Sequence, residues 1–279
     1  MTATALLRNA REPSNAPSAS AAAKALRAAG ALWFAAAVIG QWAFAVYVAS
    51  FYGGAAISRR FERWNEVLVG GYVPGGVIGN VALGAHLLLA LVITIGGPLQ
   101  LVPQLRVRAP GAHRWNGRVY VATALLITLS GLYAVWTRGT AGGASMRVGI
   151  SLNGVLILVC ASLAWRRARA GAIASHRRWA LRTFMLVSGV WFFRIGLMLW
   201  ILVHGGPVGV GDDFDGPFVR AWAFGCYLFP LLLLQGFLWA EARPVARDKY
   251  LVAALLACVA LATAVGIAGA LLGMWLPRM

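Results

Sequence analysis

Long apolar runs alternate with short polar loops along most of this chain. The runs cover about residues 28–48, 77–102, 115–136, 147–164, 179–203, 218–240 and 250–276. Each approaches or exceeds the roughly 20 residues that a helix needs to cross the hydrocarbon core of a bilayer. The pattern predicts an all-α, multi-pass transmembrane bundle of about seven helices. An odd number of crossings would place the two termini on opposite sides of the membrane.

Composition supports a membrane protein and argues against a soluble one. The 279 residues are 60% hydrophobic and 12% charged, and their mean hydropathy is +0.74. A water-soluble core of this size could not hide so much apolar surface. The formal net charge of +17 would suggest nucleic acid in a soluble protein, but here the basic residues lie in short loops, where anionic lipid attracts them. We therefore expect the lipid bilayer as a partner, and no nucleic acid.

The two ends of the chain differ in character. Residues 1–27 are rich in Ala, Ser and Pro and are predicted to be a disordered cytoplasmic tail. A cleaved signal peptide is the alternative, but the run that follows can span the bilayer and lacks a clear cleavage site. Residues 28–279 are predicted to form one transmembrane domain with its core at 77–204. In the last run, Gly269 and Gly273 form a GxxxG pair, which indicates close helix contact within the bundle or, alternatively, a homodimer.

The placement of basic residues predicts the orientation. If the N-terminus lies in the cytoplasm, the inner segments hold 17 of the 25 basic residues and the outer segments hold 7, while Arg194 lies within a run. Cytoplasmic loops of membrane proteins carry an excess of Lys and Arg. The sequence therefore predicts a cytoplasmic N-terminus and an external C-terminus.

Several chemistries lack the residues that they need. All eight carboxylates lie outside the apolar runs, whereas proton relays and cation-coupled transporters usually rely on acids at membrane depth. No GxSxG, HExxH, Walker or GxGxxG motif stands in a supporting context. The cysteines Cys160, Cys226 and Cys258 lie inside apolar runs and form no CxxC motif. The sequence leaves open whether the protein is an enzyme.

Two histidines mark the first candidate site. His113 and His176 lie at the predicted cytoplasmic starts of the third and fifth helices, among arginines and without a nearby acid. One interpretation is that snorkelling arginines hold lipid phosphate here. The other is a redox protein in which the two imidazoles are axial ligands of a b-type haem iron. Arg118 and Arg182, one to two turns beyond the histidines, would then pair with the haem propionates.

A second candidate site lies deeper in the bilayer. His86, Asn153 and Arg194 are predicted at similar depth on the second, fourth and fifth helices. A guanidinium in hydrocarbon costs at least a few kcal/mol unless it faces a partner or water. The three side chains could form an internal polar clamp. They could instead line an outward-facing cavity for an anionic or polar ligand, in which case the protein would be a transporter or a lipid-interacting protein.

The residues around both histidines resemble a family of bacterial predicted membrane proteins catalogued as domain of unknown function 2306. The resemblance covers roughly His86 to Arg194, and Ala180 replaces the methionine of the family pattern. It implies a multi-pass membrane fold without an established activity, and a bacterial origin places the chain in the cytoplasmic membrane. The matching positions are Gly97, Pro98, Gln100, His113, Arg114, Gly117, Arg118, Tyr120, His176, Arg178, Trp179, Arg182 and Arg194.

A looser resemblance links His113, Arg114, Trp115 and Gly117 to the HSWxG signature of cytochrome b561-type proteins. It implies a four-helix core with two histidine pairs at two depths. His113 and His176 would supply the inner pair, but His86 has no histidine partner at its depth. This resemblance therefore implies one haem rather than two.

Overall fold

The structure is a computed structural model that describes residues 16–279, and their only regular elements are helices. Short π-helical or 3₁₀ turns occur at Ala49–Gly53 (η2), Phe61–Glu66 (η3), Leu271–Trp275 (η4) and Leu276–Arg278 (η5). The α-helices are Ala16–Val48 (α1), Gly54–Ile57 (α2), Val77–Leu101 (α3), Pro103–Arg108 (α4), Pro110–Arg138 (α5), Gly143–Arg169 (α6), Ile173–Val187 (α7), Gly189–His204 (α8), Pro217–Ala242 (α9) and Ala246–Ala270 (α10).

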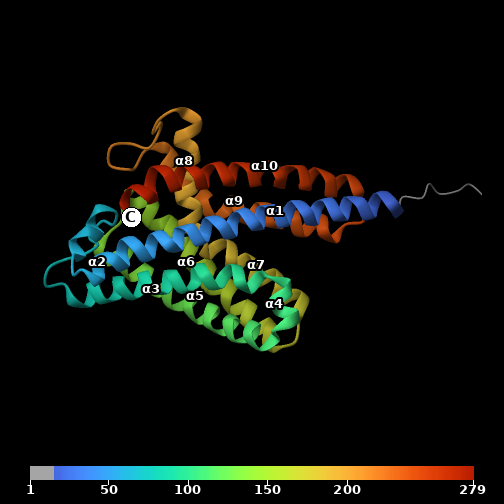
Figure 1. Cartoon of the computed structure of the whole chain (residues 1–279), viewed down its shortest axis with the longest axis horizontal. Helices are drawn as coiled ribbons and strands as arrows, with labels where there is room; N and C mark the ends of the chain where they lie inside the picture. Colours follow the sequence, from blue (N-terminus) through green and yellow to red (C-terminus); the bar gives the residue numbers. More distant parts are fainter. Residues whose placement is uncertain (1–15) are drawn as a thin grey trace, which may run out of the picture.

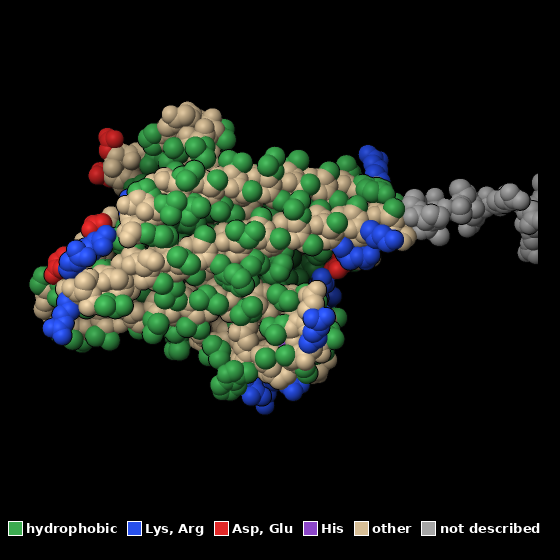
Figure 2. All heavy atoms as spheres, in the orientation of Figure 1, with side chains coloured by type: hydrophobic (Ala, Val, Ile, Leu, Met, Phe, Trp, Pro, Cys, Tyr) green, Lys and Arg blue, Asp and Glu red, His purple; other side chains and the backbone are tan. Residues whose placement is uncertain are grey.

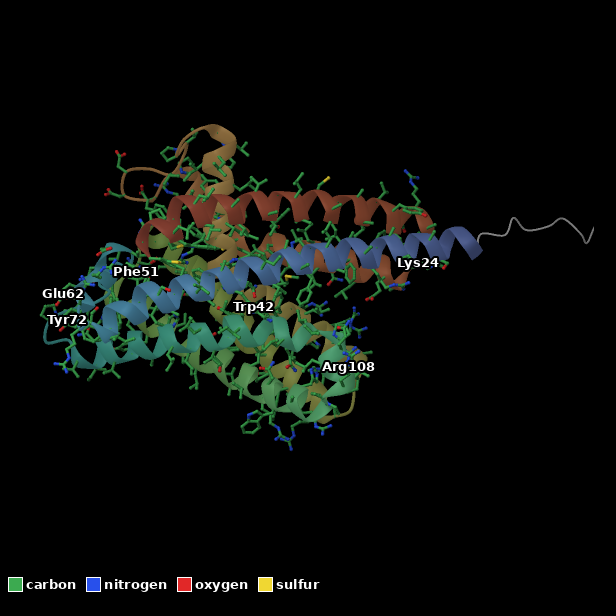
Figure 3. All side chains as sticks on the ribbon, in the orientation of Figure 1. Lys24, Trp42, Phe51, Glu62, Tyr72 and Arg108 are labelled. Carbon is green, nitrogen blue, oxygen red and sulfur yellow. The ribbon has the colours of Figure 1, made fainter. Side chains whose placement is uncertain are left out.

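The helices confirm the predicted all-α, multi-pass bundle. Six helical segments of the described chain are long and apolar enough to cross a membrane, and the bent pair α7 and α8 makes a seventh if it counts as one span. α1 starts at one end of the bundle and the chain finishes at the other end (Figure 1). Lys24 and Arg108 lie at the end where α1 starts, which we call the basic end, whereas Glu62 and Tyr72 lie at the opposite end (Figure 3).

The first helix begins earlier than the apolar pattern indicated. The disordered tail predicted for residues 1–27 is wrong for residues 16–27, which form the first turns of α1; residues 1–15 lie outside the described part. Alanine, the best helix former, fills much of this segment. Ala22 and Leu26 are also buried, and Leu26 packs against a cluster that includes Ala240 and Leu256. The low hydropathy of residues 16–27 concealed this helix.

Apolar side chains cover the outside of the bundle. Leu232, Leu261 and Ile39 are 70%, 69% and 68% exposed, although each lies within a long helix. Figure 2 shows hydrophobic side chains along the whole length of the visible face, with charged side chains gathered at the two ends. A soluble protein rarely exposes so large an apolar surface, whereas lipid tails would cover it in a bilayer.

Aromatic residues form the core at the end opposite the basic end. Trp275, Tyr47 and Phe51 are almost completely buried. The Tyr47 ring stacks on both others, with centroids 5.7 Å from Phe51 and 6.3 Å from Trp275. These rings join the end of α1 and the η2 turn after it to the η4 turn after α10, and α1 and α10 pack along their length.

The predicted fifth membrane helix is broken at Ser188. α7 and α8 meet there at an angle of 54°. A Ser–Gly pair is a common cause of such a kink, and nearby polar side chains bond the groups at the break. Asn153 Nδ2 donates to the carbonyl oxygen of Leu186 at 3.1 Å, and Gln41 Nε2 donates to the Ser188 hydroxyl at 2.9 Å. Two polar residues inside apolar helices are thus explained by one helix break.

The glycines of the last helix pack within the chain. A Cβ atom at Gly269 would lie 2.7 Å from Leu202 Cδ1, and one at Gly273 would lie 2.8 Å from Met198 Cε. Both neighbours belong to α8, which therefore covers this face of the last helix. The GxxxG pair makes the predicted close contact inside the bundle, and its glycines lend no support to a homodimer.

Candidate functional site

The end of α3 and the start of α5 are joined by a network of amide side chains. Asn116 Nδ2 donates to Gln100 Oε1 at 2.8 Å and to the Gly96 carbonyl oxygen at 2.9 Å. Gln100 Nε2 donates to the carbonyl oxygen of His113 at 3.1 Å. A Cβ atom at Gly117 would lie 2.7 Å from Gln100 Nε2, so a larger residue there would displace the Gln100 amide from this position. The network holds the backbone of His113 against α3.

The amide network contains two residues that were not predicted as site residues from the sequence. Gln100 and Asn116 were not among the predicted site residues, although they stand within the stretch that carries the family resemblance. A glutamine and an asparagine inside otherwise apolar helices are the signal that could have identified them, because polar side chains in membrane helices commonly bond to a neighbouring helix.

The His113 imidazole has one unsatisfied nitrogen. Its Nε2 lies 3.5 Å from Gln100 Nε2. An amide nitrogen can only donate, so this contact requires the His113 tautomer that carries its proton on Nδ1. Nδ1 is buried and has no hydrogen-bond partner among the described residues. A buried donor without an acceptor costs about 1–3 kcal/mol, so a ligand or water that accepts from Nδ1 would stabilise the site.

The His176 imidazole is oriented by α6. Its Nδ1 lies 2.9 Å from the carbonyl oxygen of Ala164. A carbonyl only accepts, so Nδ1 carries the proton, and the neutral ring keeps a lone pair on Nε2. Metal-ligating histidines commonly have their second nitrogen held in this way. His176 lies close enough to His113 for the two rings to interact electrostatically.

Arg182 and Arg118, the two predicted propionate partners, have different surroundings. Arg182 donates to Gln235 Oε1 of α9 at 2.8 Å and lies over the Trp179 ring. Arg118 is exposed. The charges within electrostatic range of His113 are instead those of Arg106 and Arg114, on α4 and in the first turns of α5. The structure thus places two further cations near His113.

The three residues of the second candidate site have separate partners. His86 Nδ1 lies 3.0 Å from the Ser130 hydroxyl of α5, and Asn153 bonds to α7 at the helix break. Arg194 donates to the Val190 carbonyl oxygen of its own helix at 3.2 Å. Across residues 20–279 no hydrogen bond or ion pair joins any two of the three, so the predicted polar clamp is not formed. A ligand role for each residue stays a prediction.

Arg194 faces aromatic side chains of α1 and its continuation. Its guanidinium carbon lies 5.2 Å from the centre of the Phe44 ring, where a cation–π attraction operates. The guanidinium is also within electrostatic range of the hydroxyls of Tyr47 and Tyr52. Both hydroxyls are buried, and each lies close enough to the other to interact with it. The neighbours of Arg194 are therefore aromatic side chains rather than the predicted His86 and Asn153.

Comparison with known proteins supports the resemblance and adds no activity. Residues 83–213 match the model of a family described as Predicted membrane protein (DUF2306). Searches of curated proteins and of solved structures gave no match. The resemblance to cytochrome b561-type proteins stays a prediction. The matched segment holds both histidines and the amide network, so the candidate site lies within the part of the chain that resembles this family of predicted membrane proteins.

Proposed function

We propose that this membrane protein binds a ligand between His113 and His176 at the basic end of the bundle. The bond from His176 Nδ1 to the Ala164 carbonyl oxygen supports the proposal best, because it fixes the ring and leaves the Nε2 lone pair available. Nδ1 of His113, nearby, is buried without a partner. The pair offers nitrogen ligands and one donor, and a b-type haem with two imidazole ligands is the occupant we propose.

The side chains fit this occupant to different degrees. His176 would hold the haem iron through Nε2 while its Nδ1 keeps the bond to the Ala164 carbonyl oxygen. His113 would give up its contact with Gln100, which at 3.5 Å is at the long limit for a hydrogen bond and would be lost at little cost. Arg106 and Arg114, with Arg118, supply guanidinium groups for the propionates, whereas Arg182 already bonds to Gln235. A bound haem would supply one-electron transfer, and the protein residues would hold and orient it.

Haem binding has a direct optical test. Protein purified from haem-replete cells should show a Soret band and, after reduction, sharp α and β bands. His113→Ala or His176→Ala should each abolish the low-spin spectrum, because six-coordinate iron with two imidazoles needs both nitrogens. His204→Ala is the matched control, since His204 bonds to the Trp200 carbonyl oxygen at the far end of α8. A colourless wild-type preparation would contradict haem and favour lipid phosphate bound by the arginines near the two histidines.

The proposal includes the orientation predicted from the basic residues, with this site at the cytoplasmic face. A reporter fused after Met279 should then be external, and one inserted within residues 243–249 should be cytoplasmic, because 17 basic residues lie in the inner segments against 7 in the outer ones. Alkaline phosphatase and green fluorescent protein fusions measure the two sides. Finding both fusions on one side would contradict a span that crosses between these positions.

A further inference from the structure

A cleft of about 620 Å³ enters the bundle between α1 and α10 on one side and α7, α8 and α9 on the other. This volume is within the usual range for a ligand pocket. Most of the lining is apolar, as illustrated by Trp33, Phe34, Leu181, Phe229, Leu233 and Val259. The cleft is separate from the histidine site, since neither His113 nor His176 lines it.

Charged side chains stand among the apolar lining where the cleft reaches the basic end. Arg27 and Arg177 come from α1 and α7, and Glu241 comes from the end of α9. Arg177 binds Glu241 through two contacts of 2.6 and 3.1 Å, so these two charges offset each other. Arg27 is exposed, and within residues 20–279 it has no ion-pair or hydrogen-bond partner. The charged lining therefore carries a net positive charge.

The visible surface agrees with this description. Figure 2 shows the basic end hollowed between α1 and the helices below it, with Lys and Arg side chains on both sides of the hollow. An occupant must therefore combine a long apolar part with an anionic part at one end. A small soluble anion would leave the apolar walls uncovered, and a neutral hydrophobic molecule would make no use of Arg27.

We propose that the cleft binds one anionic glycerophospholipid. An acyl chain lies among the apolar side chains, and the phosphate lies beside Arg27, whose planar guanidinium group suits phosphate oxygens and is not bound to a carboxylate of residues 20–279. The net positive charge selects a lipid with net negative charge over a zwitterionic one, although both carry a phosphate. The tail and the headgroup thus use different parts of one cleft, and each part can be changed separately.

Native mass spectrometry of the full chain in detergent tests the headgroup. With equal amounts of dioleoyl phosphatidylglycerol and dioleoyl phosphatidylcholine, the wild type should retain one phosphatidylglycerol per chain. Arg27→Gln should weaken this retention about fivefold, the usual contribution of one basic residue near an anionic membrane surface. Arg108→Gln, an exposed arginine of α4 outside the cleft, should leave retention unchanged. Equal retention of both lipids would overturn the assignment of an anionic lipid.

A second pair of variants tests the acyl-chain site. Ala262 of α10 lines the cleft, whereas Ala264 is exposed on the same helix and does not line it. Ala262→Phe should fill the cleft and abolish retention of phosphatidylglycerol, and Ala264→Phe should retain it. Retention by both variants would place the lipid elsewhere and overturn the proposal. If Ala262→Phe fails to fold, as judged by size-exclusion chromatography, the choice between the two lipids and the Arg27→Gln result still decide.

Discussion

Gly266→Val should lower the free energy of unfolding of the detergent-solubilised protein by about 2 to 3 kcal/mol, near the top of the range for overpacking a well-packed interior. A Cβ atom at Gly266 would lie 2.6 Å from the carbonyl oxygen of Ile195 and 3.2 Å from its carbon. Both are backbone atoms of α8, so no side chain can rotate away and the two helices must separate. Unfolding by titration with sodium dodecyl sulfate, followed by circular dichroism, would measure the loss.

Gly236→Val is the matched control for this change. Gly236 lies in α9, and a Cβ atom there would meet nothing within 4 Å. Its substitution should alter the free energy of unfolding by no more than about 0.5 kcal/mol, as expected for a site without close contacts. Equal losses at the two positions would show that the close approach of α8 and α10 does not limit stability.

Arg138→Met should release the segment of residues 67–76 from the bundle. Arg138 Nη1 donates to the carbonyl oxygens of Gly70 and Gly71 at 3.0 and 2.8 Å. Its Nη2 donates to the Gly76 carbonyl oxygen at 3.3 Å and to Asn80 Oδ1 at 2.8 Å. Losing one such charge-assisted bond typically costs about 1.5–3 kcal/mol. We therefore expect amide hydrogen exchange in residues 67–76 to accelerate at least about tenfold, as measured by mass spectrometry.

Two further variants make this test specific to the guanidinium. Arg138→Lys should not restore protection, because a single ammonium cannot reproduce the planar fork that reaches four acceptors. Arg147→Met should leave exchange in residues 67–76 unchanged, since Arg147 is exposed and its guanidinium lies over the Trp136 ring at 5.8 Å. Unchanged exchange in Arg138→Met would mean that other contacts hold the segment.

Hydrophobicity along the chain determined the fold class of this protein. A segment inside hydrocarbon must bond its own backbone groups, so a run of about 20 apolar residues predicts a helix without knowledge of its neighbours. The same reasoning placed His113 and His176 at the starts of two helices, although α5 and α7 begin at Pro110 and Ile173, before the apolar runs that predicted them. It missed the start of α1, because alanine-rich residues 16–27 are helical without being strongly apolar.

Depth in the membrane did not determine which side chains meet. His86, Asn153 and Arg194 were predicted at similar depth, but a position along a helix does not specify the side of the helix that a residue faces. Packing decided this: His86 faces Ser130, Asn153 bonds at the break between α7 and α8, and Arg194 lies over Phe44.

The break itself and the lipid cleft also depend on tertiary structure. At the bend, Gln41 of α1 donates a hydrogen bond to the Ser188 hydroxyl and Asn153 of α6 donates one to the Leu186 carbonyl oxygen. These bonds satisfy polar groups that would otherwise be costly in an apolar environment. The cleft is lined by residues of α1, α3, α7, α8, α9 and α10, which are far apart in the sequence. Apolar periodicity determines that a segment is a membrane helix, whereas the helix rotations and crossing angles that bring such residues together follow from side-chain packing between helices.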